Sequence, residues 1–257
     1  MPRGITKILD FKILNFERGI TMSKPKAVIS LFDYTGAISK PWLDAGYAVY
    51  QFDQQLEDSI HGLNWHIGGD YRGWDSMINA IYATCDPVLI MSAPPCTDLC
   101  SSGAAHMAKK RLANPDYEAE AMDMVLLAKR ISDQHGGTPY AIENPVGRIS
   151  TLYRRPNFYF HPWEFGGYLP EDDTPPNYVT PARDAYSKKS GIWHNQGFIE
   201  PVRRPVSLPE GYKYSLHHLK LGGKTLKTKN IRSATPRGFA LAVFEANHQP
   251  VKQPVLI

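Results

Sequence analysis

Short apolar segments alternate with longer amphipathic ones between residues 27 and 145, and this alternation constrains the fold more than any other feature. The predicted strands are residues 27–32, 47–52, 87–91 and 140–142. The predicted helices are residues 38–45, 74–84 and 117–134. Strands that alternate with helices in this way predict an α/β fold with a doubly wound, Rossmann-like parallel sheet. Ligands of such sheets bind at the carboxyl ends of the strands.

The composition predicts a protein of the cytoplasm. The chain has 257 residues with three cysteines, an odd number that shows no disulfide framework and suits a reducing compartment. It has no apolar run of the roughly 20 residues that a membrane helix needs. Its first residues also lack the cationic-then-apolar pattern of a signal peptide. We therefore expect a monomer in the cytoplasm (the host cytoplasm if the gene is viral) that makes no membrane contact.

Positive charge is concentrated in one stretch of the second half. Nine of the 29 basic residues but one of the 25 acidic residues lie between Arg203 and Arg237, so this stretch carries a net charge of +8 and the rest −4. Such a distribution predicts a polyanionic partner. The alternative is a solvated, flexible loop. Gly222-Gly223, with the Thr and Lys residues that follow, predicts a loop in either case.

Polar turns follow the first two predicted strands. The first turn contains Phe32, Asp33, Thr35 and Gly36. A turn of small residues lets backbone N–H groups approach a cofactor, although an ordinary strand–helix turn has the same pattern. Asp53 follows the second strand, where an acid commonly accepts hydrogen bonds from ribose hydroxyls, and Asp70 is placed to reach an adenine amine. A helix cap or a surface acid is the alternative for both.

The strand at residues 87–91 leads into Pro94-Pro95-Cys96. Two prolines fix the backbone, and a cysteine in a loop beside a helix N-terminus has a lowered pKa, which favours the nucleophilic thiolate. Cys85, within a more apolar run, has the surroundings of a structural cysteine. Cys96 and Cys100 do not predict a zinc site, because no second pair of Cys or His ligands accompanies them.

Glu143-Asn144-Pro145 follows the last predicted strand. A glutamate at the carboxyl edge of the sheet, near a thiol, can protonate or hydrogen-bond a ring nitrogen of a substrate. The alternative is that Glu143 caps the turn that follows.

The ordered set of motifs resembles the DNA cytosine-5 methyltransferase family, and most of all its short, divergent bacteriophage members. Phe-x-x-Thr-Gly, Pro-Pro-Cys and Glu-Asn occur in the family's order, and residues 232–240 resemble its last motif, a helix that closes the cofactor pocket. The resemblance implies that S-adenosylmethionine donates a methyl group to carbon 5 of cytosine in DNA. It also implies that Cys96 is the covalent nucleophile and that Glu143 binds the edge of a flipped cytosine.

The resemblance extends to cofactor and DNA contacts. The residues assigned to the cofactor are Phe32, Asp33, Thr35, Gly36, Asp53, Asp70, Pro94 and Ser233. The residues assigned to DNA are Arg203, Arg204, Lys224, Lys227, Lys229 and Arg232. No metal is expected.

The sequence departs from the family at four points. Tyr34 replaces a glycine, Pro145 replaces a valine, and Arg232 replaces an asparagine. A Gln-x-Arg-x-Arg element is absent, and Arg154-Arg155 or Lys188-Lys189 are its possible substitutes. We expect Arg232 to contact a DNA phosphate, and its alternative role is to favour a donor or substrate with an extra anionic group.

Four parts of the chain follow from these assignments. They are an N-terminal extension (1–26), a methyltransferase core (27–185), a small basic target-recognition insert (186–229) and a C-terminal segment that returns to the core (230–257) with a helix at 235–247. Three alternative functions remain: amino methylation of adenine or cytosine, cytosine-5 methylation of RNA or a free nucleotide, and an inactive nucleic-acid-binding module.

Overall fold

The computed structural model describes residues 24–101, 106–209, 221 and 225–248. One sheet forms its centre, with strands β1 (Lys26–Leu31), β2 (Ala48–Phe52), β3 (Ser59–His61), β4 (Asn64–Ile67), β5 (Asp86–Ser92), β6 (Tyr140–Pro145), β7 (Phe158–Phe160) and β8 (Ser190–His194). The helices are α2 (Lys40–Asp44), α3 (Asp75–Thr84), α4 (Met107–Ala113), α5 (Tyr117–Gln134), α6 (Ile149–Leu152), α8 (Leu226–Ser233) and α9 (Arg237–Asn247). Three 3-10 helices are η1 (Tyr71–Gly73), η3 (Pro162–Tyr168) and η4 (Ala182–Asp184).

The strand order across the sheet is β3-β4-β2-β1-β5-β6-β8-β7. Five neighbouring strands are parallel to one another: β4, β2, β1, β5 and β6. At the edges, β8 runs antiparallel to both β6 and β7, and β3 runs antiparallel to β4. This mostly parallel sheet flanked by helices confirms the predicted α/β class and is compatible with a doubly wound, Rossmann-like fold.

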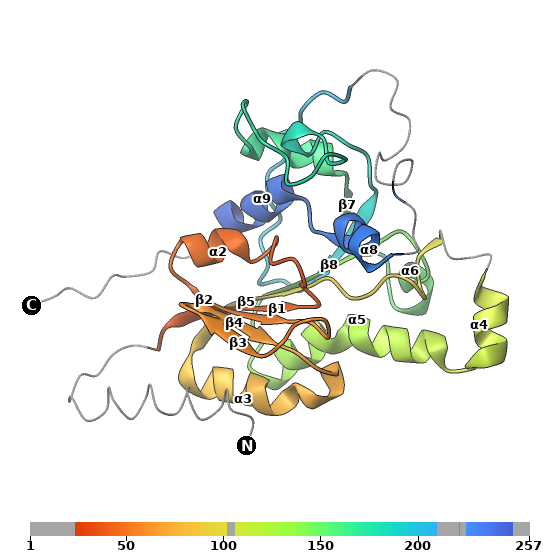
Figure 1. Cartoon of the computed structure of the whole chain (residues 1–257). Coiled ribbons are helices and arrows are strands. Elements are labelled where there is room, and N and C mark those ends of the chain that lie inside the picture. The colour runs from red at the N-terminus through yellow and green to blue at the C-terminus, as the bar shows by residue number, and fades with distance from the viewer. Residues whose placement is uncertain (1–23, 102–105, 210–220, 222–224, 249–257) are drawn as a thin grey trace, which may run out of the picture.

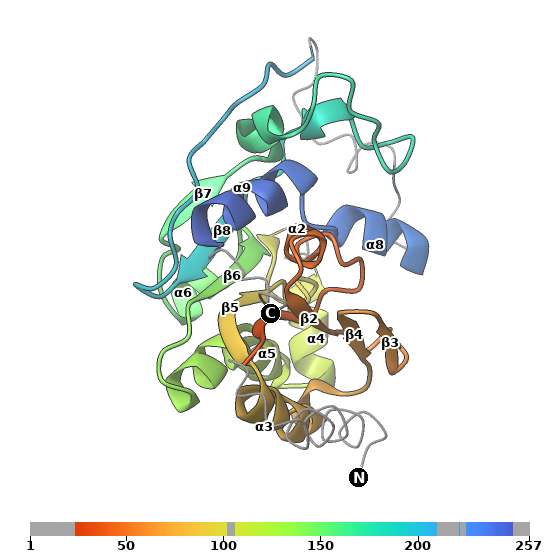
Figure 2. The ribbon, with the colours of Figure 1, turned by 90° about the vertical axis from the view of Figure 1, so that its left-hand side faces the viewer.

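Helices cover both faces of the sheet (Figure 1). Because side chains alternate along a strand, neighbouring residues belong to different cores. Ile29, Ile90 and Ile142 face α3 and α5, whereas Val28, Leu89 and Ala141 face α2 and α9. Figure 2, turned by 90°, shows the same two layers, with α2 and α9 on one side and α3 and α5 on the other.

The chain leaves β1 in one direction toward β2 and β4, and then resumes on the other side of β1 with β5 and β6. The point where the order reverses therefore lies between the carboxyl ends of β1 and β5. In open α/β sheets, ligands bind in the crevice at such a point. The turn after β1 and the Pro-Pro-Cys loop after β5 both begin there.

Four strands were not among the predicted elements. Residues after Phe52 were expected to form only a polar turn, but they contain the β3–β4 hairpin. The strand β4 has the sequence Asn-Trp-His-Ile and is only partly buried, so it lacks the apolar run that identifies a buried strand. The strands β7 and β8 lie at the other edge, and β8, within the range assigned to the insert, belongs to the main sheet.

The C-terminal region differs from its prediction in two respects. Residues 226–229 were predicted to be part of a loop, and they form the first half of α8, with Thr225 as a side-chain cap that accepts a hydrogen bond from the Thr228 N–H. The helix expected from residue 235 begins at Arg237, and Pro236 is its N-cap. The loop prediction for residues 226–229 is therefore wrong.

Candidate functional site

The loop after β5 is fastened to the ends of two strands. The Ala93 N–H donates to the Leu31 carbonyl oxygen (3.0 Å), which keeps the start of the loop beside the end of β1. The buried Asn144 side chain in β6 donates from Nδ2 to the Pro94 carbonyl oxygen at 2.8 Å. Two motifs about 50 residues apart in the chain are thus joined directly, and Pro94 helps to anchor the loop through its backbone.

The loop also packs closely on the segment after β6. The Arg148 N–H donates to the Leu99 carbonyl oxygen (2.7 Å), and the Ser101 N–H donates to the Val146 carbonyl oxygen (3.1 Å). A Cβ atom at Gly147 would lie 2.0 Å from the Leu99 carbonyl oxygen, so only glycine allows this approach. The Cys96 region is therefore held against β6 by backbone contacts.

Cys96 begins a tight turn in which its carbonyl oxygen accepts hydrogen bonds from the Leu99 N–H (3.1 Å) and the Cys100 N–H (2.9 Å). This turn brings the Cys96 thiol into a hydrogen bond with the buried Cys100 thiol. That hydrogen bond, together with burial, raises the pKa of Cys96 well above its usual range. The predicted lowering of this pKa is therefore wrong, because a second thiol lies beside the sulfur.

Lys188 lies close enough to Cys96 for its positive charge to lower the pKa of the thiol, against the effect of Cys100. It is half-buried and comes two residues before β8. The sequence suggested Lys188-Lys189 only as one of two possible substitutes for a missing motif. The structure brings Lys188 to the thiol because β8 is antiparallel to β6, so the residues before β8 lie at the carboxyl edge.

Glu143 lies within β6 and not after it, opposite Ile192 of β8. The residue is 5% exposed, and its Oε1 atom is buried without a hydrogen-bond partner. Its negative charge contributes to the raised pKa of Cys96, which places the two side chains near one another. A buried carboxylate oxygen without a partner is costly in free energy and is suited to receive a ligand. Since Oε1 contacts no backbone N–H, that oxygen does not cap the following turn.

The turn after β1 is organised around Asp33. Its buried carboxylate accepts hydrogen bonds from the Gly36 N–H (2.8 Å), the Ser30 hydroxyl (2.9 Å) and the Ser39 hydroxyl (3.1 Å). Burial nevertheless raises the pKa of Asp33 from its ordinary value. With these donors already bound, the Asp33 carboxylate shapes the turn.

The backbone of the same turn is left-handed at two positions, Phe32 (φ 57°) and Gly36 (φ 68°). Glycine adopts this conformation freely, whereas a bulky residue such as phenylalanine rarely does, and such residues concentrate at ligand sites. The Phe32 ring packs on Trp74, with centroids 5.4 Å apart. The Thr35 hydroxyl contacts the Asp33 carboxylate (3.4 Å) and accepts from the Ala37 N–H (3.3 Å).

Asp53 lies at the carboxyl end of β2, beside the turn after β1. It is 7% exposed, its Oδ1 atom accepts from the Gln55 N–H (2.8 Å), and burial raises its pKa. The charge of Asp53 also contributes to the raised pKa of Asp33, so the two acids are neighbours. The Asn230 side chain of α8 donates to Gln55 Oε1 (3.0 Å), which brings α8 to the same edge. Ser233, in the last turn of α8, is exposed.

Asp70 is placed differently from the other predicted acids. Its carboxylate caps η1 by accepting from the Arg72 N–H (2.9 Å), and it forms an exposed ion pair with the Arg72 guanidinium (3.2 Å). The side chain is 62% exposed. In this arrangement both oxygens of the Asp70 carboxylate are bound by Arg72 of η1.

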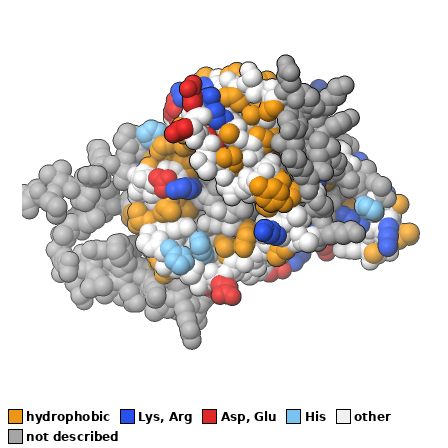
Figure 3. Space-filling model, turned by 45° about the horizontal axis from the view of Figure 1, so that its top comes forward, with side chains coloured by type: hydrophobic (Ala, Val, Ile, Leu, Met, Phe, Trp, Pro, Cys, Tyr) orange, Lys and Arg blue, Asp and Glu red, His pale blue; other side chains and the backbone are white. Residues whose placement is uncertain are grey.

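The residues assigned to DNA fall into two groups. Arg203 pairs with Glu164 (3.4 Å), and Arg204 pairs with Glu245 (3.1 Å between Nη1 and Oε2), so acids of the fold already hold both guanidinium groups. Lys224 lies outside the described residues. A second group is on α8, where Lys227 and Lys229 are exposed and Arg232 is half-buried. On the face in Figure 3, basic and acidic side chains are interspersed.

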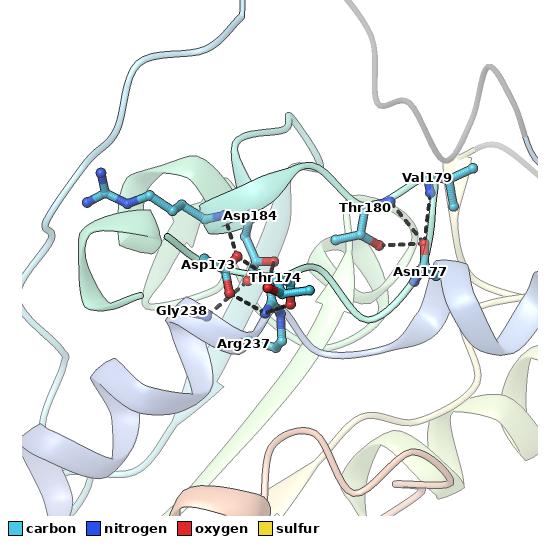
Figure 4. A network of polar contacts seen from close by, with 9 residues as sticks. Asp173, Thr174, Asn177, Val179, Thr180, Asp184, Arg237 and Gly238 are labelled. Carbon is cyan, nitrogen blue, oxygen red and sulfur yellow. Dashed lines mark hydrogen bonds and ion pairs between the residues drawn. The ribbon is translucent and has the colours of Figure 1, made fainter. Parts of the chain in front are cut away.

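A buried ion-pair network joins the start of α9 to the segment before β8 (Figure 4). Arg237 pairs with Asp173 (2.7 Å) and Asp184 (3.2 Å), and the Asp184 carboxylate also accepts from the Gly238 N–H (2.9 Å). The side chains of Asp173 and Asp184 are 5% and 2% exposed. We call this network of Arg237, Asp173 and Asp184 the Arg237 clamp. It was not predicted from the sequence, because Asp184 and Asp173 lie 53 and 64 residues from Arg237 in the chain.

Replacing Arg237 with Met should destabilise the fold strongly, because two buried carboxylates would lose their cation. The expected loss is about 3–5 kcal/mol in the free energy of unfolding. Urea denaturation measures it. The matched control is Arg204→Met, which breaks an ion pair whose side chains are 48% and 52% exposed and should cost about 0–1 kcal/mol. Equal losses in the two variants would contradict a structural role for the clamp.

No family model and no curated protein matches the chain. Among the described residues, no helix is both long enough and apolar enough to cross a membrane. In the same part of the chain, no group of three or more His, Cys, Asp and Glu side chains is arranged to hold a metal ion.

Proposed function

We propose that this protein is an S-adenosylmethionine-dependent methyltransferase that acts on carbon 5 of cytosine in DNA. The observation that carries the proposal is the approach of Cys96, in the loop after β5, to Glu143 of the adjacent strand β6, where a buried carboxylate oxygen has no partner. A thiol and a carboxyl group on neighbouring strand ends are the two groups that this reaction needs from the protein.

The sheet supports the same proposal. A parallel sheet with one reversed strand inserted next to its last strand is typical of S-adenosylmethionine-dependent methyltransferases. Here β8 is reversed in this position, between β6 and β7, and β3 is a second reversed strand at the opposite edge. A likeness of fold alone does not define a reaction. It adds to the site because the cofactor crevice of such a sheet adjoins the loop that carries Cys96.

The cofactor assignment fits part of the predicted set of residues. Asp53 is the acid best suited to ribose hydroxyls, since the Asp33 carboxylate is already bound by the turn. The left-handed turn at Phe32 and Gly36 lets the backbone approach a ligand. The contact of Asn230 with Gln55, two residues from Asp53, supports a role for α8 in covering the cofactor. When bound, S-adenosylmethionine supplies the methyl group.

The chemistry follows from the two side chains. The Cys96 thiol loses its proton to water, and its sulfur forms a bond to carbon 6 of cytosine while the electron pair of the ring double bond becomes available at carbon 5. Glu143 hydrogen-bonds or protonates the ring nitrogen N3, where negative charge would otherwise collect. After carbon 5 is methylated, loss of its proton returns an electron pair to the ring and releases the Cys96 thiolate. The positive charge of Lys188 favours the Cys96 thiolate both before it attacks carbon 6 and when it is released.

Both faces of the base must be accessible, so the target cytosine must leave the duplex. DNA binding then depends on cations near the site that are not already bound to acids of the fold. Lys227 and Lys229 on α8 meet this requirement better than Arg203 and Arg204 do, because each of these arginines is paired with a glutamate.

Replacing Lys227 and Lys229 together with Gln should weaken binding to all duplex sequences alike. It should also reduce the slope of log affinity against log salt by roughly 0.9 for each DNA phosphate that the two lysines neutralise. Fluorescence anisotropy with a labelled duplex at several salt concentrations measures the slope. The control variant, Lys129→Gln with Arg130→Gln, removes two charges from α5 on the other face of the sheet. A slope that matches that of the control would move the DNA contact away from α8.

Mass spectrometry of nucleosides tests the proposed reaction directly. Duplex DNA incubated with the protein and S-adenosylmethionine should yield 5-methylcytosine and S-adenosylhomocysteine in equal amounts. Parallel reactions with RNA and with free cytosine nucleotides decide the substrate class. Product with RNA alone would correct the substrate and keep the chemistry, whereas N-methylated bases or no product with any substrate would overturn the proposal.

A further inference from the structure

Two histidines of the β3–β4 hairpin have no part in the proposed function. The hairpin lies at one edge of the sheet, and β3 is the outermost strand there (Figure 2). In its register Ser59 is opposite His66, and His61 is opposite Asn64. Because side chains alternate along a strand, these four polar side chains share one face of the hairpin.

Ring nitrogens of both histidines converge on one hydroxyl group. The Ser59 Oγ atom lies 3.2 Å from His66 Nδ1 and 3.2 Å from His61 Nε2. The centroids of the two imidazole rings are 5.1 Å apart. His61 is exposed and His66 is half-buried, so the pair is accessible from solvent.

These distances match those of a tetrahedral metal site. Zn²⁺ binds nitrogen and oxygen ligands at about 2.0–2.2 Å, so the ligand atoms of a tetrahedral site lie roughly 3.3 Å from one another. In the same geometry the centroids of two bound imidazole rings are roughly 5.2 Å apart. Both nitrogen–oxygen distances and the separation of the rings agree with these values. An ion between the three groups therefore requires little movement of the hairpin.

We propose that His61, His66 and the Ser59 hydroxyl bind a divalent transition-metal ion such as Zn²⁺, with a fourth position for water or an external ligand. The described residues hold no group of three or more His, Cys, Asp and Glu side chains arranged for a metal, and here the third ligand is a hydroxyl. The ion would link the side chains of β3 and β4 and so hold the outermost strand on the sheet. This site does not depend on the proposed methyl transfer.

Asn64 supplies the second contact that metal-bound histidines use. Its Nδ2 atom lies 3.0 Å from His66 Nε2, and its Oδ1 atom is buried without a hydrogen-bond partner. When His66 Nδ1 binds the ion, the ring proton is on Nε2, and rotation of the amide lets Oδ1 accept a hydrogen bond from it. Metal-bound histidines almost always donate from their second nitrogen to such an acceptor. Metal binding thus gives a partner to an oxygen that lacks one.

Zn²⁺ titration in competition with a chromophoric chelator tests the site. Because thiolates also bind Zn²⁺, the parent protein for the titration carries Cys96→Ala and Cys100→Ala. Adding His61→Gln or His66→Gln should weaken binding at least about tenfold, since loss of an outer contact alone costs about 10–100-fold. The matched control is His248→Gln, which removes an exposed histidine that stacks on Phe244 and should leave the affinity unchanged. No Zn²⁺ binding by the parent, or equal affinities with and without His66, would overturn the proposal.

Hydrogen exchange locates the ion and needs no enzymatic activity. Zn²⁺ should slow exchange of backbone amides between residues 57 and 68, because it holds the two strands together. The same addition should have no effect on these amides in His66→Gln. Slower exchange in another segment only, or in His66→Gln as well, would show an adventitious ion and overturn the proposal. Since neither measurement involves methyl transfer, failure of the proposed function leaves this test intact.

Discussion

Methyl transfer should be lost when Cys96 is replaced by Ala, with a fall in rate of at least about 10⁴-fold. Without the thiol, no bond forms to carbon 6 of cytosine and carbon 5 stays too weak a nucleophile to accept a methyl group. Affinity for S-adenosylmethionine should stay within about threefold, because the residues assigned to the cofactor are not changed. Single-turnover measurements with labelled donor give the rate, and equilibrium binding gives the affinity.

Cys100→Ala is the matched control, since it removes the neighbouring thiol and keeps the nucleophile. The hydrogen bond between the two thiols is the main cause of the raised pKa of Cys96, so this variant should lower that pKa. Alkylation of Cys96 at neutral pH should accordingly become faster. DNA that contains 5-fluorocytosine should form a covalent complex with wild-type protein and with Cys100→Ala. If Cys96→Ala keeps more than about a tenth of the wild-type rate, the covalent mechanism is wrong.

The core of the fold could be predicted because its elements are long or strongly apolar. The helix α5 has the predicted bounds, residues 117–134. Eighteen residues with amphipathic spacing identify a helix, and the two glycines that come soon after them mark where it ends. The strands β1, β2 and β5 are buried along most of their length and have the apolar runs that identify them. Strands at the edges could not be predicted in the same way. The strand β7 has three residues, and its pairing partner lies more than 30 residues away in the chain.

The candidate site was partly predictable, because residues at the carboxyl ends of parallel strands meet whatever lies between them. That rule brings Cys96, Glu143, Phe32 and Asp53 to one edge. It does not describe what each side chain touches. The thiol partner of Cys96 depends on how the loop turns, and Asp70 binds its own neighbour, Arg72.

Sequence patterns did not predict the contacts between segments that are distant in the chain. Lys188 approaches the site because β8 enters the sheet antiparallel to β6, and nothing near Lys188 in the chain predicts that pairing. The Arg237 clamp was missed for the same reason, since its acids come from a segment in which the sequence predicted no helix or strand. A single sequence therefore indicates the chemistry at strand ends better than it indicates the groups that support it.

Glu143→Gln should reduce the rate of methyl transfer by about 10²–10⁴-fold, the usual range for loss of a general acid. Gln keeps the size of the side chain and can still donate a hydrogen bond, but it cannot transfer a proton to N3 of the base. Its effect should appear in kcat, with KM for DNA changed by less than about threefold, because the interaction strengthens as the ring is activated. Pre-steady-state quench-flow separates the chemical step from product release.

The competing role for Glu143 is a structural cap, and the chain offers a true cap for comparison. Glu164 accepts a hydrogen bond from the His161 N–H (2.6 Å) at the start of η3. Glu164→Gln should therefore cost roughly 1 kcal/mol of stability and leave turnover near normal. Glu143→Gln should show the reverse, a large loss of turnover with a small change in melting temperature, because the buried Oε1 has no partner to lose. If both variants lose only stability, Glu143 does not act as the acid.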